Sequence, residues 1–137
     1  MSEVRLEVNN RCFGCGADNA RGLRMQIERR GDEWMSRLTV PEHFQGWAEI
    51  AHGGFLCAVM DEVMGWAARG GAGDAVTARL DARFLQPVAV GREIAVRGRM
   101  TQRRGRVVRA RAQVELEDGT VAAKATGVFV IMADGGD

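Results

Sequence analysis

One apolar helix constrains the fold of this chain more than any other feature of its sequence. Between residues 54 and 68, apolar side chains recur so closely that they occupy every face at helical spacing. These side chains are Phe55, Leu56, Val59, Met60, Val63, Met64, Trp66 and Ala67. A helix of this kind is buried, and Gly70-Gly71 predict where it ends. The rest of the chain must therefore surround a single central helix.

Segments in which apolar and polar residues alternate, as in half-buried strands, lie on both sides of the helix. Residues 23–27 and 34–40, separated by Gly31-Asp32, predict a first hairpin. Four further segments follow at residues 76–84, 94–101, 108–116 and 121–132. In the first of these, Val76, Ala78, Leu80, Ala82 and Phe84 alternate with Thr77, Arg79, Asp81 and Arg83. This order predicts an α+β protein with a five- to six-stranded antiparallel sheet wrapped around one long central helix. Such a sheet leaves an uncovered edge, so we expect a homodimer that continues it.

Composition limits the classes of protein to which the chain can belong. Its 137 residues, 46% hydrophobic and 27% charged, predict one domain over residues 1–137, with an irregular lead-in at 1–22. The first seven residues lack the apolar core of a signal peptide, and the longest apolar run, residues 55–60, is too short to span a membrane. Three cysteines, an odd number, fit a reducing compartment. We expect a cytoplasmic protein with no membrane partner.

The net charge of +1 gives no general attraction to nucleic acid, but arginines are unevenly distributed. Between Arg79 and Arg111 there are ten arginines and only two acidic residues. Four of them, Arg97, Arg99, Arg109 and Arg111, alternate with apolar residues. This alternation predicts that they share the solvent face of the sheet. The alternative is that some of them, or the turn at 103–106, bind the phosphates of a nucleotide-bearing substrate.

Two adjacent carboxylates, Asp61 and Glu62, interrupt the apolar helix. A buried carboxylate is costly, so it needs either a partner or a function. Adjacent helical positions point about 100° apart, so the two side chains lie on different faces. Asp61 lies among small residues, which leave room for a ligand. Glu62 lies with Val59 and Trp66, where it either makes a structural contact, such as a pair with an arginine, or contributes to substrate binding.

The segment His52-Gly53-Gly54 stands where the helix begins. Glycines there leave the first N–H groups of the helix unshielded, and the helix dipole favours negative charge at that end. Such a site suits the oxyanion that forms in acyl transfer. A glycine pair by itself also fits a simple tight turn. The carboxylate of Asp61, nine residues after His52, makes the catalytic interpretation the stronger one.

Several motifs together resemble the hotdog-fold acyl-CoA thioesterases of the phenylacetate-pathway type. They are His52-Gly53-Gly54-Phe55 with Asp61, Ala75-Val76-Thr77-Ala78, Phe84-Leu85-Gln86-Pro87-Val88, Gly91, Gly119-Thr120-Val121-Ala122 and Ala125-Thr126-Gly127-Val128-Phe129. The likeness runs from about residue 12 to residue 132. It extends to the lead-in Cys12-Phe13-Gly14-Cys15-Gly16, although Ala20 stands where many members have proline.

The resemblance implies hydrolysis of acyl- or aryl-CoA thioesters without a metal or other cofactor. It makes Asp61 the general base or the nucleophile, and it places backbone N–H groups of Gly53, and of Gly54 as a second candidate, at the thioester carbonyl. His52 organises the loop at the helix start. Thr77 matches a position where related enzymes hold the attacking water with a hydroxyl. Related enzymes carry an Asn or Gln whose side chain faces the thioester. Gln45 matches this position, and Gly46 is the alternative match.

The spacing of Gly54 and Asp61 bears on the assembly. Seven residues separate them, so their Cα atoms lie roughly 10 Å apart along one helix. One thioester is hard to hold against both groups from the same helix. We therefore expect a homodimer, or a dimer of dimers (a homotetramer), whose active sites lie at the subunit interface, as the resemblance also implies.

Other features leave alternatives open. Cys12-x-x-Cys15 fits zinc, a redox pair or a structural role. The structural role is favoured, because the chain offers few further zinc ligands and glycines stand where a redox pair would need the start of a helix. Trp34, Trp47 and Trp66 either line an aryl-acyl pocket or pack in the core or a dimer.

Three other functions compete with hydrolysis. A non-catalytic acyl-CoA sensor would use the same fold. A hotdog dehydratase would use His43, but its partner carboxylate would fall at Cys57, which cannot serve as that acid. A nucleic-acid binder would use the arginines, and it ranks last because they alternate as a sheet face should.

Overall fold

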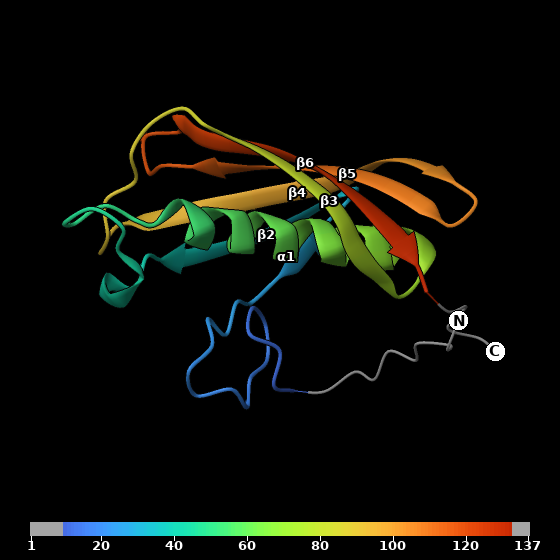
Figure 1. The fold of residues 1–137 in the computed structure, drawn as a ribbon, viewed down its shortest axis with the longest axis horizontal. Helices are drawn as coiled ribbons and strands as arrows, with labels where there is room; N and C mark the ends of the chain where they lie inside the picture. The colour runs from blue at the N-terminus through green and yellow to red at the C-terminus, as the bar shows by residue number, and fades with distance from the viewer. Residues whose placement is uncertain (1–9, 133–137) are drawn as a thin grey trace.

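The fold consists of one long helix, α1 (Gly53–Ala72), packed against a single six-stranded antiparallel sheet (Figure 1). The computed structural model describes residues 10–132, with only the backbone at 71 and 72. The strands are β1 (Glu28–Arg30), β2 (Glu33–Thr39), β3 (Ala75–Phe84), β4 (Glu93–Arg104), β5 (Val107–Glu115) and β6 (Val121–Ile131). Their order in the sheet is β1-β2-β4-β5-β6-β3, and a short 3-10 helix, η1 (Glu42–Phe44), precedes α1. The predicted α+β architecture is confirmed.

The hydrophobic core lies between α1 and the sheet. From the helix, Val59, Met60, Val63 and Met64 are completely buried. The prediction that the helix is buried on every face was nevertheless wrong. Cys57 and Asp61 belong to one stripe that stays half-exposed in the single chain, because no element of the described chain covers it. No helix in the described part of the chain is long and apolar enough to cross a membrane.

The helix ends later than Gly70-Gly71 predict. It continues to Ala72, and Gly73 terminates it with a φ of 115°, while its N–H donates to the Arg69 carbonyl at 3.0 Å. Gly70 has a different role. A Cβ at Gly70 would lie 2.5 Å from Cζ2 of Trp34, so only glycine allows the helix to approach that indole ring. Gly70 is therefore needed for packing against Trp34, and it does not end the helix as the sequence pattern predicts.

The alternation of residues 23–27 predicts a strand there, but none of these residues belongs to one, so this part of the prediction was wrong. Strand β1 covers only Glu28–Arg30 and pairs with β2 across the turn at Gly31. The N–H groups of Leu23 and Met25 donate instead to the carbonyls of Phe13 and Gly14, both at 2.9 Å. The lead-in thus takes the hydrogen bonds that a longer strand would have needed.

A β-bulge changes the predicted alternation of β3. The register with β6 shifts between Thr77, which pairs with Phe129, and Arg79, which pairs with Val128, so Ala78 is the extra residue. Phe129 is 1% exposed and belongs to the core. Cross-strand partners share a face, so the bulge turns Thr77 toward the helix side and leaves Arg79 on the outer side. Simple alternation predicts, incorrectly, that both lie on the polar face.

Candidate active site

Asp61 is the centre of the half-exposed stripe of α1. The hydroxyl of Thr77 on β3 donates a hydrogen bond to Oδ1 of Asp61 at 2.7 Å. The bulge makes this contact possible, because it brings Thr77 to the helix side of β3. Two residues that are sixteen positions apart thus meet beside the uncovered face of the helix.

The surroundings of Asp61 suit a proton acceptor. Burial raises the pKa of Asp61, the hydrogen bond from Thr77 lowers it, and the nearby charge of Glu62 raises it, with a net shift upward. A raised pKa brings a carboxylate closer to the strength that a general base needs near neutral pH. Cys57, one turn earlier, has its own pKa raised by burial and by the charge of Asp61. The thiol beside Asp61 therefore stays protonated.

His52 is the N-cap of α1. Its Nδ1 accepts a hydrogen bond from the Gly54 N–H at 2.8 Å, and its own N–H donates to the Phe44 carbonyl at 2.9 Å. Nδ1 must therefore lack a proton, which leaves the imidazole proton on Nε2. A Cβ at Gly54 would lie 2.9 Å from Nδ1, so glycine at this position allows the ring to reach the backbone. The cap occupies the N–H of Gly54.

The N–H of Gly53 differs from that of its neighbour, because no acceptor for it is recorded among residues 10–132. It stands at the positive end of the helix dipole. The ring of Phe84, at the end of β3, lies next to it, since a Cβ at Gly53 would be 3.5 Å from Phe84 Cζ. Phe84 is 51% exposed. Sequence reasoning treated Phe84 as a strand residue, and nothing in the pattern indicated its place beside Gly53.

Gln45 organises the loop before the helix. Its Nε2 donates to the Glu42 carbonyl at 2.8 Å, and its Oε1 accepts from the Glu49 N–H at 2.6 Å. Glu49 has a φ of 64°, an uncommon conformation for a residue with a side chain, and the amide of Gln45 holds it there. Gly46 lies against His52, because a Cβ at Gly46 would be 3.4 Å from the Cα of His52. Both amide atoms of Gln45 are thus used within the loop.

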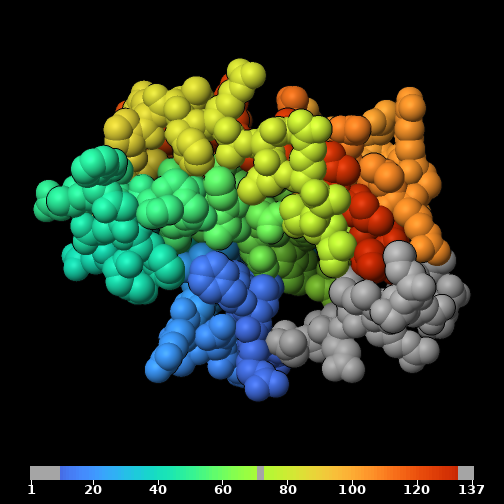
Figure 2. All heavy atoms as spheres, in the orientation of Figure 1, coloured from blue at the N-terminus to red at the C-terminus, as the bar shows by residue number. Residues whose placement is uncertain are grey.

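Glu62 faces the lead-in and not the stripe of Asp61. The Cys12 thiol donates to Oε1 of Glu62 at 3.4 Å. Burial and the neighbouring Glu62 raise the pKa of Cys15 to about 12. In the space-filling view, the lead-in (blue) lies against α1 (green) (Figure 2). Glu62 thus makes a structural contact, and its partner is a thiol where the sequence suggested an arginine as one example.

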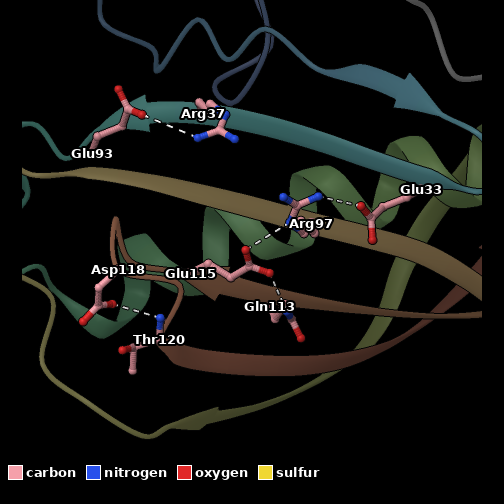
Figure 3. A network of polar contacts seen from close by, with 8 residues as sticks. All are labelled: Glu33, Arg37, Glu93, Arg97, Gln113, Glu115, Asp118 and Thr120. Atoms are coloured by element: carbon pink, nitrogen blue, oxygen red, sulfur yellow. Dashed lines mark hydrogen bonds and ion pairs between the residues drawn. The ribbon is translucent and has the colours of Figure 1, made fainter.

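The arginines lie on the outer face of the sheet, as the alternation predicts. Figure 3 shows Arg97 between Glu33, at 2.8 Å, and Glu115, at 3.1 Å, on the face of the sheet turned away from α1. Arg99 stands directly opposite Arg111. A hollow of about 720 Å³ on this face is lined by arginines from three strands, and it contains neither Asp61 nor His52. Nothing in this arrangement connects the arginines with the candidate site.

Two of the three tryptophans have packing partners. The rings of Trp34 and Trp66 lie 5.9 Å apart, and Arg69 lies over Trp66 at 5.3 Å. Trp47 differs, because it is 84% exposed in the loop that Gln45 organises. The rings of His43 and Phe44 lie 4.5 Å apart and are tilted by 39° to one another. Trp47 is thus the one tryptophan in the described chain with a large exposed surface near the helix start.

Comparison with known proteins identifies the family. The model of the thioesterase superfamily matches residues 48–123, more than half of the chain, and this stretch includes His52, Asp61 and Thr77. The chain belongs to the thioesterase superfamily. No curated protein matches it in sequence.

Solved structures agree on the fold. A thioesterase superfamily protein superposes with a TM-score of 0.82 at 25% identity, over 87% of this chain, which spans 62% of the length of that protein. A mutant of the phenylacetic acid degradation protein PaaI from Thermus thermophilus gives 0.72 at 23% identity, over 80% of this chain and 94% of its own. A Streptococcus mutans protein bound to acetyl CoA superposes with a TM-score of 0.75 at 17% identity, over 98% of this chain and 97% of its own. The predicted hotdog fold is confirmed by these structures, and the predicted likeness to thioesterases is confirmed at the level of the superfamily.

Proposed function

We propose that this thioesterase superfamily member hydrolyses acyl- or aryl-CoA thioesters to the free acid and CoA. The observation that carries the proposal is the half-exposed carboxylate of Asp61, which Thr77 holds at 2.7 Å and whose pKa is raised by burial. We infer that the thioester is one of CoA, because solved structures of the same fold contain coenzyme A or acetyl CoA.

In the proposed reaction, Asp61 acts as general base and removes a proton from water as the water attacks the thioester carbonyl. The negative charge that develops on the carbonyl oxygen is stabilised by the Gly53 N–H and by the helix dipole. His52 is a positioning residue, because its Nδ1 holds the helix start through the Gly54 N–H. Thr77 orients the Asp61 carboxylate. Gln45 keeps the preceding loop in place.

The proposed active site is shared between two copies of the chain. Gly53 and Asp61 are eight positions apart on α1, which separates their Cα atoms by about 12 Å. A carbonyl and its attacking water need contacts within a few ångströms, so one helix cannot supply both. Strand β3 ends the sheet, and Val76, Phe84 and Leu85 are 37%, 51% and 53% exposed there. A second copy paired along β3 would cover these side chains and bring its own Asp61 to Gly53.

A panel of acyl-CoA esters tests the proposed activity. We expect the purified protein to release free CoA thiol from at least one class among aryl, short, medium and long acyl esters. The exposed rings of Trp47 and Phe84 next to the helix start favour aryl or other bulky acyl groups. Binding measured by calorimetry without thiol release across the whole panel would instead identify a non-catalytic acyl-CoA sensor.

Replacing Thr77 with valine should move the acid limb of the pH profile of kcat/KM to higher pH. The Thr77 hydroxyl stabilises ionised Asp61 and lowers its pKa, so its loss raises that pKa further. Asp61 must be ionised to act as a base. As the pH is lowered, the valine variant should therefore lose its activity at a higher pH than the wild type does. We expect a displacement to higher pH, because the variant loses the hydrogen bond that favours the ionised carboxylate, while the burial that disfavours it remains. Thr77→Ser keeps the hydroxyl and should retain the wild-type limb. Identical profiles for the valine variant and the wild type would contradict the role of Thr77.

A further inference from the structure

Three potential metal ligands meet where the lead-in contacts the helix. Cys12 and Cys15 come from the lead-in, and Glu62 comes from α1. One ligand atom from each residue lies within 4.8 Å of the other two, and all three residues are half-buried. Glu62 is the ligand that sequence analysis did not connect with the cysteines, because 50 positions separate it from Cys12.

The spacing of these atoms agrees with one bound zinc ion. Zinc binds sulfur at about 2.3 Å and carboxylate oxygen at about 2.1 Å, so tetrahedral geometry places a sulfur and an oxygen ligand roughly 3.6 Å apart. Cys12 Sγ and Glu62 Oε1 are 3.4 Å apart. Two thiolates with one carboxylate form a set that favours zinc over magnesium or calcium, which prefer oxygen ligands alone.

The backbone of the lead-in is shaped around this cluster. The Gly16 N–H donates to the Cys12 carbonyl at 2.9 Å and closes a tight turn that contains both cysteines. A Cβ at Gly14 would lie 2.5 Å from Cδ of Glu62, and a Cβ at Gly16 would lie 2.4 Å from the Cys12 nitrogen. Both positions therefore require glycine for the turn to close against the Glu62 carboxylate.

Little apolar burial holds this part of the chain. Between residues 10 and 24, the two residues that are fully buried are Gly14 and Gly16, which have no side chain. Phe13 is 50% exposed and contacts Phe44 at a ring distance of 6.4 Å, and Leu23 packs, partly buried, against the core. An irregular segment with so few apolar contacts gains from another means of fixation, and small folds commonly use a metal or a disulfide for this purpose.

We propose that Cys12, Cys15 and Glu62 bind one zinc ion, which fastens the lead-in to α1. Water occupies the fourth position of the tetrahedron, since the ligands are only half-buried. Binding replaces the thiol protons of the two cysteines, and these protons leave to solvent. The ion lies on a different face of the helix from Asp61, about 100° around the axis, so it takes no part in the proposed hydrolysis.

Metal analysis of the full-length protein tests this site. After loading with zinc under reducing conditions and desalting, the wild type should retain about one zinc per chain, as three protein ligands predict. Cys12→Ser, Cys15→Ser and Glu62→Gln should each lose most of it, whereas Cys57→Ser is the matched control and should keep it. Cobalt in place of zinc should show thiolate-to-metal absorption in the wild type and in Cys57→Ser only. Circular dichroism establishes that each variant is folded.

Three results would overturn the binding of zinc at this site. The first is a reduced wild type that retains no zinc, and the second is equal retention by Cys15→Ser. The third is a Cys12–Cys15 disulfide that persists in the reduced, zinc-loaded protein.

Tryptic cleavage after the exposed Arg21 and Arg24 tests whether the ion fastens the lead-in to the helix. Chelation should accelerate this cleavage in the wild type, and an unchanged rate would show that the ion does not hold the lead-in. None of these measurements depends on thioester hydrolysis.

Discussion

Asp61→Asn is expected to lower kcat for thioester hydrolysis by about 10²–10⁴-fold, the range that a positioned general base contributes. Asparagine has almost the same shape as aspartate, and its Oδ1 can still accept the hydrogen bond that Thr77 donates at 2.7 Å. The variant loses only the ability to take a proton from water. A free-thiol release assay under saturating substrate measures the effect. Turnover equal to that of the wild type would remove Asp61 from the mechanism.

The same variant should be at least as stable as the wild type at neutral pH. The pKa of Asp61 is raised in the folded chain, mainly by burial, so the folded state disfavours its ionised form. Relative to asparagine, the carboxylate therefore lowers the free energy of unfolding above its folded pKa. This difference disappears as the pH falls below the ordinary pKa of aspartate, where Asp61 is neutral in both states. Thermal unfolding at neutral and acid pH measures it, and Asp18→Asn, on the exposed lead-in, serves as the control. A fall in Tm at neutral pH would show that the loss of activity reflects damage to the fold.

Gly54→Ala should reduce kcat/KM by about 10²-fold, since small misplacements at a catalytic site can have effects of this size. A Cβ at Gly54 would lie 2.9 Å from Nδ1 and 3.2 Å from Cε1 of His52, so the imidazole must move and the helix cap is weakened. The loss of an N-cap also lowers the free energy of unfolding by about 1 kcal/mol. Gly53→Ala is the steric comparison, because its Cβ meets Phe84 at an ordinary 3.5 Å and its N–H remains. Its loss of activity should be clearly smaller. Equal losses in the two variants would contradict the role of the His52 cap.

Combining Asp61→Asn with Gly54→Ala, two variants of strongly reduced activity, tests whether the site is shared. In a mixed dimer of one Asp61→Asn chain and one Gly54→Ala chain, a shared arrangement leaves one of the two sites with an intact helix start and an intact carboxylate. Such a dimer, isolated with two different tags, should regain up to half of the activity of a wild-type dimer. A site formed within one chain would leave both sites damaged, and the mixed dimer would stay inactive.

Local patterns in the sequence were sufficient to predict the architecture. The apolar stretch of residues 54–68 predicted a single central helix, and the alternating segments predicted the strands of the antiparallel sheet. His52-Gly53-Gly54 marked the start of the helix, which begins at Gly53 with His52 as its cap. These features are predictable because helix and strand periodicity, and the chemistry of helix ends, depend on neighbours in the chain.

The errors arose where distant parts of the chain decide the structure. The bulge at Ala78 depends on how β3 pairs with β6, and it turns Thr77 toward Asp61. The pattern at Gly70 predicts the end of the helix, but this glycine accommodates Trp34 from another element. The position of Phe84 beside Gly53 had no signal in the sequence at all.

By itself, the sequence determined that this protein has one buried helix within an antiparallel sheet, with a carboxylate in the middle of that helix. Only the tertiary structure decided what surrounds the carboxylates: Thr77 for Asp61, and the two cysteines of the lead-in for Glu62. The physical reason is that a periodic pattern defines which face of an element is apolar. Which residue of another element meets a particular side chain depends on strand register, bulges and close packing, and these exist only once the chain has folded.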